Sequence, residues 1–139
     1  MATQIVHIRS QFALNETAAR VFRALSISAF EERDSENYPQ GVYYSGAIGD
    51  FKVKVARESD EGYEDYQYWV VLKVPASSPT PLDEALHLMV AELLKAGFPA
   101  CREVGFTENS VRREVYTLDE SGNLQTKPET KLLPAKPGV

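Results

Sequence analysis

The chain has few of the residue types on which common protein chemistries depend. It contains a single cysteine, Cys101, so no intramolecular disulfide can form. Its only two histidines, His7 and His87, are too few to complete a Cys/His zinc site with that cysteine. The sequence therefore predicts no metal site, and a cytoplasmic location is expected because nothing in the fold requires an oxidising compartment.

Long apolar runs are also missing from the 139 residues. None approaches the roughly 20 residues that cross a bilayer as a helix, so no association with a membrane is expected. Residues 1–9 do not join a basic stretch to a long apolar one, and we do not expect them to act as a secretory signal. With 43% hydrophobic and 25% charged residues, the sequence predicts one domain with a core of its own.

Motifs of known catalytic sites are absent as well. Gly46 and Gly49 lie within an expected hairpin and do not precede a helix, so they do not form a nucleotide-binding loop. His87 has no second histidine one helical turn away, and no Gly-x-Ser-x-Gly elbow occurs. Cys101 follows the end of an expected helix, where the negative partial charge disfavours a thiolate. The sequence predicts no catalytic residue, no cofactor and no enzyme activity.

Alternation of apolar and polar residues predicts most of a β-sheet. Gly49-Asp50 is suited to a two-residue turn between two of its strands. Segment 27–33 fits either an extension of the preceding helix or a short strand, and 102–106 is ambiguous. Strands are expected at 4–12, 42–48, 51–57, 66–74 and 110–118, with a short partner at 124–126.

Two helices are expected from apolar residues spaced at three and four positions. The first is capped by Asn15 and runs to about residue 26. The second runs from Pro81 to Ala96, with Thr80 as its N-cap and Gly97 in position to end it. Strands grouped between two helices are typical of an α+β domain. We therefore expect a mainly antiparallel sheet of about five to six strands, with both helices packed on one face.

This single α+β domain is expected to span residues 1–126. From residue 127 the composition changes to prolines and lysines with little that packs, so residues 127–139 are expected to form a flexible C-terminal tail.

The net charge of −5 is concentrated in the middle of the chain. Residues 31–66 contain ten acids and four bases, a net charge of −6, whereas the remaining residues carry a net charge of +1. This distribution argues against nucleic-acid binding, which requires a basic surface. Six of the seven tyrosines and the only tryptophan lie between Tyr38 and Trp69. Clustered carboxylates and tyrosines favour recognition of a basic protein.

The leading hypothesis is a small inhibitor of the immunity or antitoxin type, which neutralises a basic partner such as a nuclease. Small size, acidity and the lack of a catalytic motif are typical of immunity proteins, so this hypothesis is an analogy. The candidate partner-binding residues are Glu32, Asp34, Glu36, Tyr38, Asp60, Glu61, Tyr63, Glu64, Asp65 and Tyr66.

Other interpretations stay open at this point. The acidic residues are also consistent with a solvated surface, or with a carboxylate pair that binds a cation or acts as acid and base. A small-ligand-binding domain or enzyme would place a pocket between the sheet and the helices, lined by Tyr44, Tyr68, His7 and Glu32. An accessory subunit would use an exposed sheet edge to pair with itself or with another chain.

Overall fold

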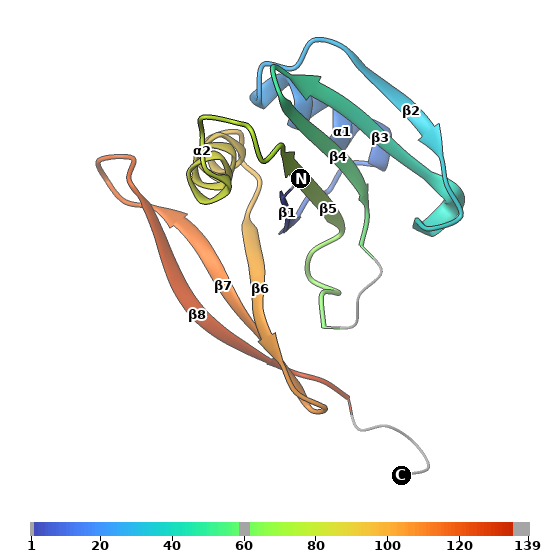
Figure 1. Cartoon of the computed structure of the whole chain (residues 1–139). Helices are drawn as coiled ribbons and strands as arrows, with labels where there is room; N and C mark the ends of the chain where they lie inside the picture. The colour runs from blue at the N-terminus through green and yellow to red at the C-terminus, as the bar shows by residue number, and fades with distance from the viewer. Residues whose placement is uncertain (1, 59–61, 135–139) are drawn as a thin grey trace.

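Eight strands form one antiparallel sheet in the order β2-β3-β4-β5-β1-β6-β7-β8 (Figure 1). The computed structural model describes residues 2–58 and 62–134. The α+β class is confirmed, but the expected number of strands was too low. The strands are β1 (Ala2–Ile8), β2 (Phe30–Asp34), β3 (Val42–Ile48), β4 (Phe51–Arg57), β5 (Tyr68–Val74), β6 (Ala100–Phe106), β7 (Ser110–Leu118) and β8 (Leu124–Leu132).

The additional strands come from the segments that the sequence left ambiguous. Segment 27–33 contributes β2, which pairs with β3 at one edge of the sheet, and residues around 102–106 form β6. At the other edge, β8 continues to Leu132, so residues 127–132 belong to the sheet although they were expected in the tail. Pro128 is compatible with an edge strand, because its missing N–H can face solvent. Residues 135–139 lie outside the described residues.

The two helices are α1 (Leu14–Ala24) and α2 (Leu82–Lys95). Neither predicted N-cap is correct: Ala13 and Pro81 occupy these positions, and neither helix has a side-chain cap hydrogen bond. The predicted end of α2 is confirmed. Gly97 has a φ of +94°, its N–H donates to the Leu94 carbonyl (3.0 Å), and the next N–H donates to Leu93 (3.0 Å), which is the Schellman arrangement.

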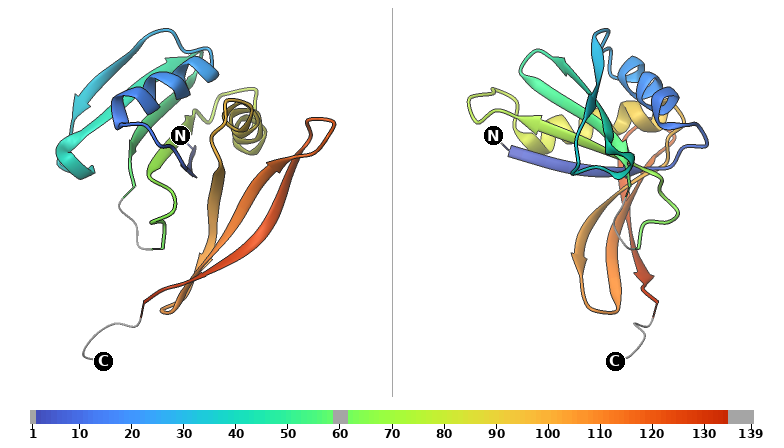
Figure 2. Two further views of the ribbon diagram at one scale, coloured as in Figure 1. Left: turned by 180° about the vertical axis from the view of Figure 1, so that it is seen from behind. Right: turned by 90° about the vertical axis from the view of Figure 1, so that its right-hand side faces the viewer.

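Both helices pack on the same face of the sheet (Figure 2). The apolar stripe of α1, including Val21 and Phe22, and that of α2, including Leu86 and Leu93, join one buried cluster with the sheet. The alternate residues of β4 and β5 supply the other side of this core, because neighbouring strand residues point to opposite faces. This is the main core of the molecule.

The opposite face of the sheet, here called the open face, is covered by neither α1 nor α2. The β4–β5 connection turns onto it and forms a second, smaller core cluster against β6 and β7. The β6–β7–β8 portion projects beyond the rest of the sheet (Figures 1 and 2). No helix within residues 2–58 and 62–134 is both long and apolar enough to span a bilayer.

Candidate functional site

The first acidic segment lies at an edge of the sheet. All five residues of β2 are exposed, and only β3 pairs with this strand. Phe30 stacks on Phe22 of α1, with ring centroids 4.7 Å apart, so the alternate residues Glu32 and Asp34 also point to the helix-covered side. The strand therefore displays carboxylates beside a free sheet edge.

The carboxylates of this segment differ in their partners. Glu31 pairs with Arg33 on the same strand, and Glu32 accepts a hydrogen bond from the Tyr44 hydroxyl at 3.2 Å. Within the described part of the chain, Asp34 and Glu36 form no ion pair. These two exposed carboxylates are not neutralised by the protein itself.

Tyr38 follows this segment in the β2–β3 connection and is half-buried. Its ring lies 4.8 Å from that of Tyr43 and 6.1 Å from that of Trp69, which it meets edge-on. These contacts hold the connection against the open face, beside the end of β4 and the start of β5. Tyr38 therefore supports the local fold and exposes only part of its ring.

The second acidic segment, between β4 and β5, has a different environment. Tyr63 and Tyr66 are only 1% and 3% exposed and belong to the second core cluster. Glu64 is exposed, whereas Asp60 and Glu61 lie outside the described residues. The two tyrosines that were expected at a binding surface thus make internal contacts.

Arg113 on β7 holds this segment in place. Its guanidinium is buried, and it donates to both carboxylate oxygens of Asp65 (2.9 and 3.1 Å) and to the Gly62 carbonyl (3.1 Å). It also pairs with Glu129 on β8. Desolvation lowers the pKa of Arg113, but the hydrogen bonds that its guanidinium donates to both carboxylates outweigh this effect and raise the pKa. Asp65 is thus neutralised by an internal cation.

His7 lies next to this group on β1. Its ring stacks on Tyr63 with centroids 3.8 Å apart, and its Nδ1 pairs with the Glu58 carboxylate. The Tyr63 hydroxyl donates to Glu103 at 3.3 Å. The histidine and its carboxylate partner are each 5% exposed at the side chain, so solvent barely reaches the pair.

Burial also suppresses the acidity of the groups beneath this segment. Desolvation raises the pKa of the Cys101 thiol and that of the Tyr66 hydroxyl, each to about 12. A thiol with such a pKa is not a nucleophile near neutral pH. The geometry is that of a packed polar cluster, which fixes the β4–β5 connection on the sheet.

The residues of the alternative ligand pocket do not line a common hollow. Tyr68 is buried in the main core and donates to the Phe12 carbonyl. Tyr44 and Glu32 lie together at the β2–β3 edge, whereas His7 is on the opposite face of the sheet. Since these side chains point to different faces, the pocket that was expected between the sheet and the helices is not formed by them.

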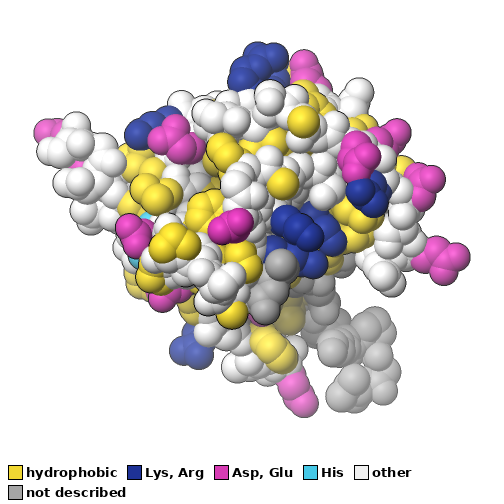
Figure 3. Space-filling model, turned by 45° about the horizontal axis from the view of Figure 1, so that its top comes forward, with side chains coloured by type: hydrophobic (Ala, Val, Ile, Leu, Met, Phe, Trp, Pro, Cys, Tyr) yellow, Lys and Arg dark blue, Asp and Glu magenta, His cyan; other side chains and the backbone are white. Residues whose placement is uncertain are grey.

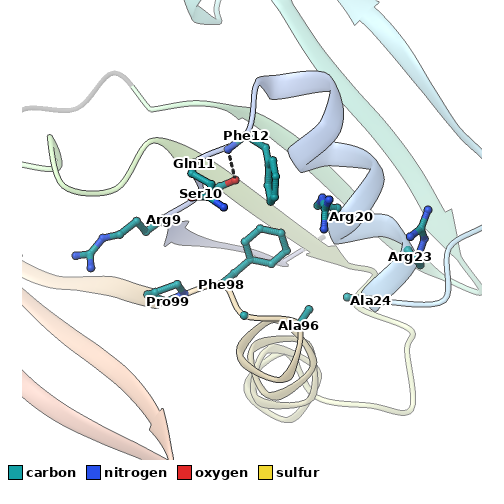
Figure 4. A pocket seen from close by; sticks show the side chains of 11 residues that line it. Arg9, Ser10, Gln11, Phe12, Arg20, Arg23, Ala24, Ala96, Phe98 and Pro99 are labelled. Carbon is teal, nitrogen blue, oxygen red and sulfur yellow. Dashed lines mark hydrogen bonds between the residues drawn. The ribbon is translucent and has the colours of Figure 1, made fainter.

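A hollow of about 520 Å³ lies where the β1–α1 connection, α1 and the α2–β6 connection meet (Figure 4). The rings of Phe12 and Phe98 face it, and three arginines stand around it. Arg20 lies 3.9 Å from the Phe12 ring centroid and pairs with Glu16. Arg9 points away from its centre and contacts Asp65. Two of the three cations are thus engaged by the protein.

A basic group that the sequence analysis missed occupies the open face between β2 and β5. Lys52, Lys54 and Lys73 line one hollow together with Arg33. Figure 3 shows basic side chains near the middle of one face and several acidic side chains along its right-hand margin. The charge count does not reveal this group. Lys52 and Lys54 lie in the net acidic residues 31–66, and Lys73 lies after them on β5.

Comparisons with known proteins add no functional information. No protein-family model matches the chain, and no curated protein or solved structure resembles it significantly. Within residues 2–58 and 62–134, no three His, Cys, Asp or Glu side chains are grouped so that they could hold a metal ion.

Proposed function

We propose that this chain is a cytoplasmic protein-binding protein without catalytic activity, of the inhibitor or immunity type, which neutralises a basic partner such as a nuclease. The surface that would hold the partner is the acidic edge, defined as Glu32, Asp34, Glu36 and the exposed part of Tyr38. Tyr63, Tyr66 and Asp65 are not part of this surface, because they make internal contacts. Asp60 and Glu61 lie outside the described residues, and the exposed Glu64 belongs to the other acidic segment.

The observation that carries the proposal is the exposure of β2. This strand is at the edge of the sheet, all its residues are exposed, and the acids that follow its alternation have no basic partner among the described residues. Charged edge strands also protect a sheet from uncontrolled pairing, and that role requires no partner. The two roles are separated by a binding measurement.

The free edge suggests how a partner would bind. A strand of the partner that pairs with β2 would use the backbone N–H and C=O groups that β3 leaves unpaired. Carboxylates beside that edge would attract a basic surface and set the orientation of the encounter. Such an electrostatic contribution is screened by salt, since the Debye length falls from about 30 Å at 0.01 M to about 3 Å at 1 M.

The test is an affinity capture from lysate of the native host, carried out at low and at high salt. The wild type is compared with the variant Glu32→Lys/Asp34→Lys/Glu36→Lys, and with the control Asp83→Lys/Glu84→Lys/Glu120→Lys. All six positions are exposed, so both variants are expected to fold. Each variant changes the net charge by the same amount.

We expect the wild type and the control to retain a basic protein at low salt. We expect the edge variant not to retain it, and we expect high salt to release it from the wild type. Equal retention by the edge variant would exclude the acidic edge as the binding surface. If no basic protein is retained at either salt concentration, the proposed function is wrong.

A further inference from the structure

A hollow of about 600 Å³ on the open face of β2–β5 combines charges that are distant in the sequence. Four bases, Arg33, Lys52, Lys54 and Lys73, and one acid, Glu31, line it. Its ionisable groups therefore carry a net charge of +3, in a chain whose net charge is −5. Arg33 and Glu31 pair with each other, which leaves the excess charge on the lysines.

The register of the strands brings the lysines together. Lys52 on β4 lies directly opposite Lys73 on β5, and like charges at such positions destabilise a sheet. The charge of Lys54, two residues further along β4 on the same face, lowers the pKa of Lys73. Within residues 2–58 and 62–134, none of these three lysines forms an ion pair. The sheet therefore retains a repulsion that an anion would relieve.

The neutral groups of the hollow suit an oxyanion. Tyr43 and Ser45 line it, and the hydroxyl of neither donates a hydrogen bond to any described residue. Lysine ammonium groups and hydroxyls both donate hydrogen bonds to phosphate oxygens. One phosphate monoester carries a charge of about −1.5 to −2 at neutral pH, so two adjacent phosphates match the net charge of the hollow.

The aromatic rings at this site favour a small ligand over a nucleic-acid strand. Single strands bind through bases that stack on free aromatic rings. The Tyr43 ring already has Tyr38 at 4.8 Å and the Lys54 ammonium at 5.2 Å from its centroid. A base would have to displace one of these neighbours, whereas phosphate groups would not.

We propose that this hollow binds a small anion with two or more adjacent phosphate groups, held by Lys52, Lys54 and Lys73 with the hydroxyls of Tyr43 and Ser45. The site shares no residue with the acidic edge and rests on different observations, so its failure would leave the proposed function untouched. The shared ligand chemistry is the run of adjacent phosphates, whether the source is an inorganic oligophosphate or the phosphate chain of a nucleotide.

The experiment is a calorimetric titration of the full chain with inorganic tripolyphosphate at low ionic strength. The variant Lys54→Gln/Lys73→Gln is compared with Lys95→Gln/Lys127→Gln, which removes two exposed lysines outside the hollow. One site is expected for the wild type and the control. Each charge-assisted hydrogen bond is worth on the order of tenfold in affinity, so the hollow variant is expected to bind at least about tenfold more weakly.

A second measurement separates binding from folding. Because the lysines repel each other, the ligand-free Lys54→Gln/Lys73→Gln variant is expected to melt at a higher temperature than the wild type. Tripolyphosphate is expected to raise the melting temperatures of the wild type and of the control variant more than that of Lys54→Gln/Lys73→Gln. Adenosine triphosphate and a single-stranded oligonucleotide serve as further probes. Tighter binding of adenosine triphosphate than of tripolyphosphate would identify a nucleotide as the source.

Three results would overturn the proposal. The first is the absence of tripolyphosphate binding to the wild type. The second is an equal loss of affinity in the control variant, which would show only a general attraction to positive charge. The third is binding of the oligonucleotide more tightly than of any small phosphate, with the same dependence on Lys54 and Lys73, which would assign the hollow to nucleic acid.

Discussion

Two acidic segments of this chain are similar in composition and different in environment. Residues 31–36 contain four acids and residues 58–65 contain five. The first forms the exposed edge strand β2 and the turn after it, whereas residues 62–65 of the second pack against the sheet and are held by Arg113. Among the described residues, Asp34 and Glu36 at the sheet edge form no ion pair, whereas Asp65 in the second segment is paired with the buried Arg113. Acid-rich composition therefore does not identify a binding surface.

The largest difference between the segments is expected from their tyrosines. Tyr63→Ala should lower the free energy of unfolding by about 4 kcal/mol, since truncation of a fully buried aromatic residue leaves a cavity. Tyr38→Ala, at a half-buried position, should cost about 1 kcal/mol. Urea unfolding followed by circular dichroism measures both values, and equal losses would contradict the contrast.

Removal of the internal cation comes next. Arg113→Met should destabilise the protein by about 3 kcal/mol, because it leaves Asp65 and Glu129 together without their partner. The neighbouring Arg112 is exposed, and Arg112→Met should change stability by less than about 0.5 kcal/mol.

The Arg113→Met variant also allows an independent measurement of how firmly the β4–β5 connection covers the sheet. Cys101 is fully buried beneath it, so a thiol reagent should label the wild type slowly and Arg113→Met much faster. A small effect on both stability and labelling would mean that the aromatic packing alone holds the segment.

A smaller effect is expected for the carboxylates themselves. Asp65→Asn should cost about 2 kcal/mol, since it weakens two hydrogen bonds to a buried guanidinium. Asp34→Asn on the acidic edge should cost less than about 0.5 kcal/mol, because that carboxylate has no ion-pair partner in the described part of the chain. Chemical denaturation at neutral pH distinguishes the two, and a comparable cost for Asp34→Asn would reveal a structural role for the edge.

The smallest effect is a dependence on pH. Desolvation raises the pKa of Asp65, but the hydrogen bonds and charge of Arg113 lower it below the ordinary value of 3.8 overall. The stabilisation is therefore fully present above the unfolded-state pKa and is lost as the pH falls through the lower folded-state pKa. The stability difference between wild type and Asp65→Asn should stay constant from pH 7 to pH 5 and shrink below about pH 4. A constant difference down to pH 2 would contradict the assigned shift.

Local patterns predicted a substantial part of the fold. Both helices, the Gly49-Asp50 hairpin and the end of α2 at Gly97 follow from spacing, turn chemistry and backbone freedom within a few residues. Segment 27–33 could not be assigned in this way, because β2 is exposed along its whole length and shows no alternation of burial. The segment is a strand because it pairs with β3.

The candidate sites were less predictable than the fold. Exposure of Glu32, Asp34 and Glu36 agrees with the sequence hypothesis, but Asp65 carries the same chemistry and is held by a residue 48 positions away. The pair Lys52 and Lys73 is invisible in the sequence, since it depends on the register between β4 and β5. Counting charges along the chain gives the net charge of a segment, but it does not show which face of the sheet each charged side chain lies on or which residue it pairs with.

The sequence by itself determined the α+β class, the positions of the helices and the excess of acid in residues 31–66, because these depend on periodicity and composition. Only the tertiary structure decided which acids are neutralised and where the basic groups meet. Strand order placed β2 at an edge and Arg113 beneath the second acidic segment, and strand register placed Lys52 opposite Lys73. The physical reason is that the interaction of two charges depends on their distance in space and on the solvent between them, and neither quantity is written in the order of the residues.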